Sequence, residues 1–280
     1  MGLRVTKART AAERDRLFEF RYRIYVEELR IPTSQADHAT RRLMDPLDEC
    51  STSYVLLDQQ QVAGELRVTW LADVPDSTEI IETFAMQPAI EAFGPEAICK
   101  TSRFILDPKW RQGTAIYLLM KTVYEECWEQ GARLNYGDCS PHLLPFYEHL
   151  GFRRYMNAFE DPNYGFKFPI LMIADLGFLR HARSPLARVA ERFGEDRAAC
   201  AWFARTYPDR LVPPTVTFLS AATSGGSPTC SPVSRPRLWF SRAILCFAFS
   251  LRGLRQRRRS LRTRAWSFSE TNCAGTDLLQ

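Results

Sequence analysis

The chain has 280 residues, of which 45% are hydrophobic and 25% charged, as in ordinary globular proteins. Its formal net charge is +5, but residues 215–280 hold ten arginines against only Glu270 and Asp277. Residues 1–214 are therefore slightly acidic, which gives no electrostatic reason to expect nucleic-acid binding.

Neither the cysteines nor the histidines form a pattern that predicts a metal site or a disulfide framework. The eight cysteines and four histidines are scattered, without a CxxC pair or zinc-ligand spacing. The longest apolar run, Ala243 to Leu251, falls short of the ~18 residues that a membrane span requires, and the N-terminus lacks an apolar signal segment. We expect reduced thiols, no metal, no bound cofactor and a cytoplasmic location.

The N-terminal half predicts a strand, a long helix and a β-hairpin, followed by a second helix and a strand. Thr10 is placed to cap the long helix, on which Leu17, Phe20 and Ile24 recur at helical spacing. Four polar residues, 58–61, separate the two apolar runs of the hairpin. The predicted elements are a strand at Leu3–Ala8, a helix at Thr10–Leu29, strands at Ser53–Leu57 and Val62–Leu71, a helix at Glu79–Phe93 interrupted at Pro88, and a strand at Ala97–Leu106.

The second half begins with the clearest helix of the chain. After the loop Lys109–Gly113, apolar residues recur at helical spacing until Gly131 closes the helix. The elements that follow are a strand at Arg133–Cys139, a short helix at Pro141–Leu150, and strands at Phe152–Met156 and Phe166–Ala174. This order predicts an α/β fold with one mixed sheet and helices on both faces.

Composition divides the chain into three segments. Residues 1–175 hold the predicted sheet, and residues 176–210 predict a helical extension, in which Ser184 and Pro185 open a helix. Residues 211–280 begin as a Ser/Thr/Gly/Pro-rich linker and end in an Arg-rich segment, so we expect them to be disordered. Alternatively, this tail is an arm for peripheral membrane or nucleic-acid contact on a non-catalytic scaffold.

The segment from Ser102 to Ala115 predicts a strand that passes through a loop into a helix N-terminus. Free backbone N–H groups and the helix dipole at such an end favour a phosphate group. Gly113 permits close backbone approach, and Lys109 or Arg111 adds positive charge. An ordinary turn with a solvated basic loop is the alternative. The candidate binding residues are Lys109, Arg111, Gln112, Gly113, Thr114 and Ala115.

Residues 146–152, Phe-Tyr-Glu-His-Leu-Gly-Phe, end a short helix and enter a strand. Together with the loop, this segment resembles the GNAT superfamily. The Gln/Arg-x-x-Gly-x-Gly/Ala loop pattern of that superfamily is matched by Gly113 and Ala115, with Trp110 at the basic position. The resemblance implies a GNAT-like mixed, splayed sheet that binds an acyl thioester.

The N-terminal half resembles one branch of that superfamily, the acyl-homoserine-lactone (autoinducer) synthases and the bacterial N-acyl amino acid synthases. The resemblance covers residues 15–175, and its later half, with Pro141 and Pro169, is closer to the N-acyl amino acid synthases. Lys100 stands where the pattern has an acidic residue. The residues that carry the resemblance are Arg21, Tyr25, Asp45, Asp48, Arg67, Ser102, Arg103 and Phe104.

The resemblance implies N-acyl transfer from an acyl-CoA or acyl-carrier-protein thioester, a co-substrate rather than a cofactor, to the amine of an amino acid or related small molecule. It implies that the backbone amide of Phe104 or Ile105 polarises the thioester carbonyl, and that Tyr147 protonates the departing thiolate. Alternatively, Tyr147 is only a core aromatic residue. A long acyl chain is favoured because the first helix and the aspartate loop would cover an acyl tunnel; acetyl transfer is the alternative.

Arg21 lies on the same helical face as apolar residues and Tyr25, where an unpaired charge is costly, so it requires an acidic partner. Asp45 and Asp48 are the candidates. They serve either as ion-pair partners that fix an N-terminal lid or as groups that bind the amine.

Arg67 and Arg103 lie on otherwise apolar strands and are candidates to hold the carboxylate of an acceptor, with a core salt-bridge network as the alternative. The general base is left open between Glu65, Asp138 and a relayed water. A nucleophilic Cys139 is not favoured, because no histidine is placed beside it and buried free thiols are common.

Overall fold

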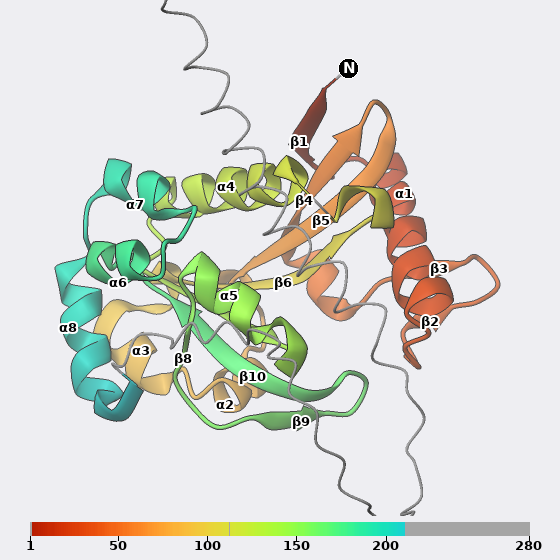
Figure 1. The fold of residues 1–280 in the computed structure, drawn as a ribbon. Helices are drawn as coiled ribbons and strands as arrows, with labels where there is room; N and C mark the ends of the chain where they lie inside the picture. The colour runs from red at the N-terminus through yellow and green to blue at the C-terminus, as the bar shows by residue number, and fades with distance from the viewer. Residues whose placement is uncertain (1, 112, 211–280) are drawn as a thin grey trace, which may run out of the picture.

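The computed structural model describes residues 2–111 and 113–210, and the linker and tail expected at 211–280 lie outside them. The strands of its central sheet are β1 (Leu3–Lys7), β4 (Ser51–Asp58), β5 (Gln61–Trp70), β6 (Ile98–Leu106), β7 (Leu134–Cys139), β8 (Arg153–Arg154), β9 (Phe159–Asp161) and β10 (Gly165–Met172). They lie in the order β1-β4-β5-β6-β7-β10-β8, with β9 paired to β10 (Figure 1). Neighbouring strands are antiparallel except β6 and β7, which run parallel.

Helices cover both faces of this sheet. They are α1 (Ala11–Tyr22), α2 (Thr78–Thr83), α3 (Gln87–Phe93), α4 (Thr114–Glu129), α5 (Leu144–Leu150), α6 (Leu176–His181), α7 (Ala187–Phe193) and α8 (Arg197–Thr206). A separate pair of short strands, β2 (Ala36–Asp37) and β3 (Arg42–Leu43), follows α1. The predicted mixed α/β sheet with helices on both faces is confirmed.

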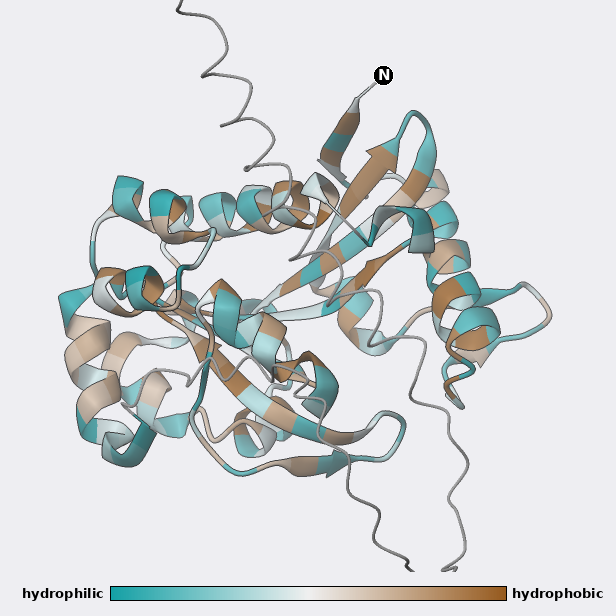
Figure 2. Cartoon of the chain, viewed as in Figure 1, coloured by the Kyte–Doolittle hydropathy of each residue, from teal (hydrophilic) through white to brown (hydrophobic). Residues whose placement is uncertain are grey.

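Three apolar cores hold the layers together. The first joins α4, through Leu119 and Val123, to one face of the sheet and includes Val189 of α7. The second lies on the opposite face, where Trp202 and Phe203 of α8 pack with the region of α2 and α3. The third packs α1 against β4 and β6. Figure 2 shows hydrophobic residues recurring along the central strands, and both hydrophobic and hydrophilic residues along α4.

The first helix begins with a capping box but changes its winding before its end. Thr10 Oγ1 accepts a bond from the Glu13 amide at 3.3 Å, while Glu13 accepts one from the Thr10 amide at 2.9 Å. The sequence predicts one helix to Leu29, but the segment Arg23–Glu28 is a π-helix, η1. Its wider turn closes with the Leu29 amide donating to the Ile24 carbonyl at 2.9 Å. A 3.6-residue period does not predict such an insertion.

Two other predicted elements have different bounds. The helix predicted at Glu79–Phe93 is broken between α2 and α3, where Ala85 adopts a positive φ of 46°. The predicted interruption is present, but it lies at residues 84–86 instead of at Pro88, which occupies the first turn of α3, where its missing N–H is tolerated. The strand predicted at Phe152–Met156 shortens to the two residues of β8.

The sheet opens between β6 and β7. The two strands pair only through Ile98, Cys99 and Lys100 of β6, the last opposite Tyr136 of β7. Beyond this point β7 continues beside β10, and β6 diverges from it. We call this opening the splay. It separates the ends of two neighbouring strands, so that their backbones no longer pair there.

A β-bulge distorts β6 beside the splay. Glu65 of β5 faces Ile105, whereas Arg67 faces Ser102, so β6 carries one extra residue in this stretch. Arg103 adopts a positive φ of 55° there. Such a bulge re-aims side chains and leaves part of the ladder unpaired.

Gly151 should be intolerant of a side chain, because it ends α5 with φ 111° and an added Cβ would lie 2.2 Å from Leu179 Cδ2. We expect Gly151→Ala to lower the free energy of unfolding by about 1–3 kcal/mol. Gly131→Ala is the matched control, because Gly131 has φ 93° but no atom within 4 Å of its Cβ position. Urea unfolding measures both; equal losses would show that the Leu179 contact contributes nothing.

Candidate functional site

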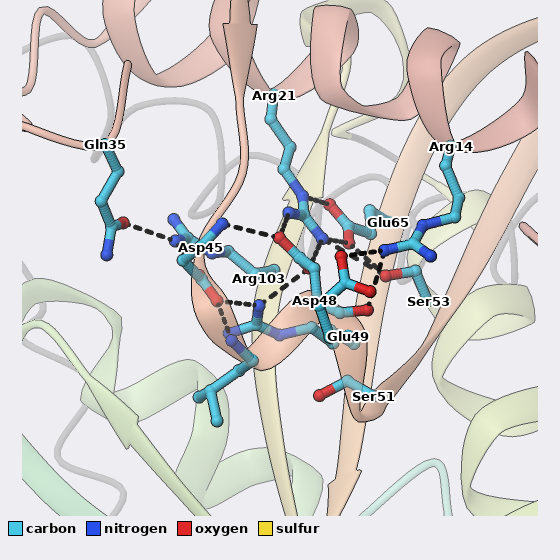
Figure 3. A network of polar contacts seen from close by, with 12 residues as sticks. Arg14, Arg21, Gln35, Asp45, Asp48, Glu49, Ser51, Ser53, Glu65 and Arg103 are labelled. Carbon is cyan, nitrogen blue, oxygen red and sulfur yellow. Dashed lines mark hydrogen bonds and ion pairs between the residues drawn. The ribbon is translucent and has the colours of Figure 1, made fainter. Parts of the chain in front are cut away.

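A buried network of charged side chains lies beside the splay and joins α1, the turn before β4, and strands β5 and β6 (Figure 3). We call it the arginine–carboxylate network. Its charged members are Arg21, Asp45, Asp48, Glu65, Arg67 and Arg103. Three guanidinium groups therefore face three carboxylates, and the network is neutral as a whole.

Arg21 lies at the centre of the network with an exposed fraction of 0%. Its Nε donates to Glu65 Oε2 at 2.8 Å, and its Nη1 donates to Asp48 Oδ2 at 2.6 Å. The other terminal nitrogen donates to both carboxylates, at 2.5 Å to Glu65 and 2.8 Å to Asp48. Arg21 thus has the acidic partners that its burial requires. Asp48 is one of the two that the sequence indicated; Glu65, instead of Asp45, is the other.

Asp45 and Asp48 are held in place by a local motif that does not depend on their contacts with the arginines. They form a capping box around the 3-10 turn Pro46–Glu49. Asp48 Oδ2 accepts a bond from the Asp45 amide at 2.8 Å, and Asp45 Oδ1 accepts one from the Leu47 amide at 3.0 Å. Their spacing of three residues therefore fixes both carboxylates in place.

Arg67 links the two aspartates from β5. Its Nη1 donates to Asp45 Oδ1 at 2.7 Å and to Asp48 Oδ1 at 2.9 Å, and its Nε donates to Ser102 Oγ at 3.1 Å. With 3% of its surface exposed, Arg67 is part of the interior.

Arg103 forms the edge of the network nearest the splay. One of its terminal nitrogens, Nη2, donates to Asp45 and also, at 3.3 Å, to Gln35 Oε1. The other, Nη1, donates to the Tyr164 hydroxyl at 2.7 Å. The guanidinium lies 5.2 Å from the centre of the Tyr25 ring. Arg103 therefore contacts one carboxylate, whereas Arg21 and Arg67 each contact two.

The network shifts the acidity of its members. Burial alone raises the pKa of the Asp45 carboxyl, but Arg67 and Arg103 together hold it well below its usual range. Burial also opposes ionisation of Asp48, whose pKa is nevertheless lowered, chiefly by Arg21. Burial raises the pKa of the Tyr25 phenol to about 12. At neutral pH both aspartates are charged and Tyr25 is protonated.

We expect acid to weaken the fold through these aspartates. Their folded pKa values lie below the unfolded value of about 3.9, so they stabilise the fold above about pH 4 and lose that contribution as the pH falls through the folded values. Urea unfolding from about pH 7 to about pH 3 measures the loss. Asp45→Asn should flatten this dependence, whereas the exposed Asp73→Asn should not. An unchanged slope in Asp45→Asn would contradict the assignment.

Asp138 lies at the base of the splay, between two ammonium groups. Lys100 Nζ is 3.3 Å from one of its oxygens, and Lys167 Nζ is 3.8 Å from the other. The Asp138 side chain is 24% exposed. Lys100, at the position where an acidic residue was expected, therefore brings a cation to the carboxylate of the neighbouring strand.

The other two groups considered for catalysis are less accessible. Glu65 is 0% exposed, and its oxygens accept bonds from Arg21 and from Ser53 Oγ, the latter at 3.0 Å. Burial, with Asp138 nearby, raises the pKa of the Cys139 thiol to about 12, so the thiolate is scarce at neutral pH.

Tyr147 of α5 lies on the opposite side of the splay from the network. Its ring packs edge-on against Phe146, at 5.3 Å between centroids, and against Phe152, at 5.4 Å. Phe104 of the bulge stacks parallel to Phe146 at 6.1 Å. Within the described residues, the Tyr147 hydroxyl makes no hydrogen bond. Burial, with a contribution from Asp138, raises its pKa well above the usual value, so the phenol keeps its proton.

The loop before α4 leads directly into a helix N-terminus. Gly113 is the N-cap with φ 90°, and Thr114 and Ala115 form the first turn. Nothing lies within 4 Å of the Gly113 Cβ position. Gln112 lies outside the described residues.

The two basic residues of the loop are ion-paired. Lys109 Nζ is 3.0 Å from Asp58, at the β4–β5 turn. Arg111 makes a two-pronged contact with Glu28 of η1, at 2.5 and 2.7 Å, and its Nε donates to the Leu106 carbonyl. The loop is thereby tied to the first helix.

A family model for the N-acyl amino acid synthase FeeM matches residues 16–174. The chain belongs to the FeeM family. An N-acyl amino acid synthase transfers an acyl group to an amine, so this protein is an N-acyltransferase. The match spans the strands on both sides of the splay and all six members of the arginine–carboxylate network.

Solved structures confirm the fold of this FeeM-family chain. BjaI, a CoA-dependent acyl-homoserine lactone synthase solved with MTA, is similar with a TM-score of 0.52 and 18% identity, over 71% of this chain and 97% of that one. FeeM itself, from uncultured soil microbes, gives 0.51 and 13%, over 67% and 96%. No curated protein sequence matches significantly.

Three residues of the candidate site were not indicated by the sequence. Tyr164 and Gln35 contact Arg103, and Lys167 contacts Asp138. Tyr164 lies in a polar turn, and Gln35 in a loop, where neither periodicity nor a motif marks a residue.

Two surface hollows lie away from the splay. One of about 670 Å³ lies between α1 and the β4–β5 turn, and one of about 510 Å³ follows η1. Among the residues that the structure describes, no cluster of metal-ligating side chains occurs, and no helix is long and apolar enough to cross a membrane.

Proposed function

We propose that this FeeM-family enzyme transfers a long-chain acyl group from a CoA or acyl-carrier-protein thioester to the amino group of an amino acid or a similar small amine. The observation that carries the proposal is the placement of Arg103 and Tyr147 beside the splay. Arg103 offers a guanidinium to a carboxylate, and Tyr147 offers a protonated phenol.

The donor is proposed to enter along the α4 N-terminus. Its phosphate groups would meet the start of α4, where the backbone of Gly113, Thr114 and Ala115 and the helix dipole favour an anion. Its thioester would then lie in the splay, where the bulge frees backbone of β6, and the amide of Phe104 or Ile105 would polarise the carbonyl. The stacked rings of Phe104 and Phe146 offer an apolar surface for the acyl chain.

The acceptor is proposed to bind with its carboxylate at Arg103 and its amine toward Asp138. Of the two carboxylates considered as base, Asp138 is favoured because it is partly exposed at the splay, whereas Glu65 is buried and already bonded to Arg21 and Ser53. Asp138, directly or through water, would take a proton from the ammonium.

The chemical step is an exchange of one bond for another. The amine nitrogen attacks the thioester carbonyl carbon, the C–N bond forms, and the C–S bond breaks. Tyr147 would give its proton to the departing sulfur and recover one from the protonated amine through solvent. The products are an N-acyl amine and a free thiol.

A panel of substrates tests this proposal. The full chain is incubated with acetyl, medium-chain and long-chain thioesters of CoA and of acyl carrier protein, each with the common amino acids and simple amines. Thiol release and product mass are followed. We expect N-acyl amino acids from long-chain donors. Product from acetyl-CoA alone would show that the enzyme is an acetyltransferase and not a long-chain acyltransferase. No product from any combination of donor and acceptor would overturn the proposal.

A further inference from the structure

The turn between β9 and β10 carries Tyr164 across the splay. The turn is fixed by Asp161, whose Oδ1 accepts bonds from the Asn163 and Tyr164 amides, both at 2.8 Å. β9 and β10 pair up to Gly165, which has φ 69°. The position of Tyr164 is therefore set by its own hairpin as well as by its contacts.

Tyr164 contacts both sides of the opening. Its hydroxyl accepts a bond from Arg103 on the β6 side, and its ring lies edge-on to Tyr25 with 6.0 Å between centroids. On the other side, Lys167 Nζ lies 5.1 Å from the centre of the same ring. One phenol thus closes the gap between the two separated parts of the sheet.

The partners of Arg103 differ from those of the other network arginines. Arg103 contacts one carboxylate, and its remaining hydrogen bonds go to the hydroxyl of Tyr164 and the side-chain amide of Gln35. A carboxylate is a stronger acceptor for a guanidinium than a phenol is. A carboxylate that reached Nη1 would therefore replace the Tyr164 hydroxyl with a gain in binding energy.

The charge around the splay also accommodates one anion. The arginine–carboxylate network is balanced, whereas Lys100 and Lys167 face the single carboxylate of Asp138. One positive charge is in excess, and Lys167 lies against the ring of Tyr164. A carboxylate at Arg103 would meet this positive charge, and the ammonium of the same acceptor would lie toward Asp138.

We propose that Tyr164 occupies the acceptor's carboxylate position on Arg103 in the free enzyme, and that an acceptor must displace its hydroxyl to bind. The inference rests on the proposed function and adds to it that the acceptor carboxylate competes with the Tyr164 hydroxyl for Arg103. It makes Tyr164 a specificity-determining residue: amines with a carboxylate displace the phenol, whereas amines without one do not.

Tyr164→Phe tests this competition, because it removes the hydroxyl and keeps the ring against Tyr25 and Lys167. We expect the KM for carboxylate-bearing acceptors to fall by about fivefold, the worth of one hydrogen bond, while the KM for the corresponding amino-acid amides stays the same. Tyr22→Phe is the matched control, because it loses a 2.9 Å contact with His38 outside the splay and should leave both values unchanged.

Binding without donor separates this inference from the proposed function. Ligand-detected NMR on the full chain, with the common amino acids and their amides, reports acceptor binding even where no acyl transfer occurs. Tighter binding of acids but not of amides to Tyr164→Phe supports the competition. Equal effects on acids and amides, weaker binding of acids, or no binding to either form would overturn it, whatever the turnover.

Discussion

Arg21→Met is expected to lower the free energy of unfolding by about 3–5 kcal/mol, because it leaves buried carboxylates without their partner. Glu65 and Asp48 both depend on Arg21, which is fully buried with them. Methionine fills a similar volume, so the loss reports charge and hydrogen bonding more than packing. Chemical denaturation of the full chain, followed by circular dichroism, measures it.

Two further variants show whether the lost charge is the cause if Arg21→Met folds poorly. Arg16→Met, on the exposed side of the same helix, should change stability by less than about 0.5 kcal/mol. Adding Glu65→Leu to Arg21→Met should recover part of the loss, since it removes an orphaned charge. A double variant less stable than Arg21→Met would show that the charge was not the cause.

Tyr147→Phe is expected to lower kcat on the order of 10²-fold or more, the usual contribution of a positioned general acid. The reason is that the phenol is held protonated beside the splay and makes no other hydrogen bond within the described residues. The loss should appear in kcat more than in KM, because the ring and its contacts with Phe146 and Phe152 remain. Thiol release under saturating substrate measures it.

The matched control is Tyr117→Phe, a half-buried tyrosine of α4. It should leave kcat within about twofold, because no group in the proposed chemistry involves it. A Tyr147→Phe enzyme that turns over as fast as Tyr117→Phe would remove the acid role, and the tyrosine would then be a packing residue.

The fold was predictable because most elements have a clear period. The helix α4 and strands β4 to β7 follow from apolar spacing and from the turn residues between them. The π-helix was not predictable, since one extra residue in a turn leaves the apolar spacing nearly intact. The break between α2 and α3 was displaced because Pro88 suits a helix start as well as a helix end.

Contacts in the site could be predicted from the sequence where a buried charged side chain required a partner of opposite charge. Arg21 needed a carboxylate because its helical face is apolar, and Asp48 supplies one. The choice of Glu65 as its second partner depends on how β5 lies beside α1, which only tertiary structure determines. Tyr164 is 61 residues from Arg103, and no local pattern connects them. The roles of these residues in catalysis stay predictions.

Because of the π-helix, the direction of the chain after the first helix depends on how many residues that helix contains. Arg21 and Tyr25 both face the network, and the wide turn of η1 lies directly where the helix passes it. Deleting one residue while the wide turn persisted would rotate the chain beyond it by about 100°, whereas a return to ordinary winding would absorb the deletion. In the first case Glu28, which holds the loop before α4 through Arg111, would point elsewhere. The residue count of this helix, not only its composition, therefore affects how the loop before α4 is held.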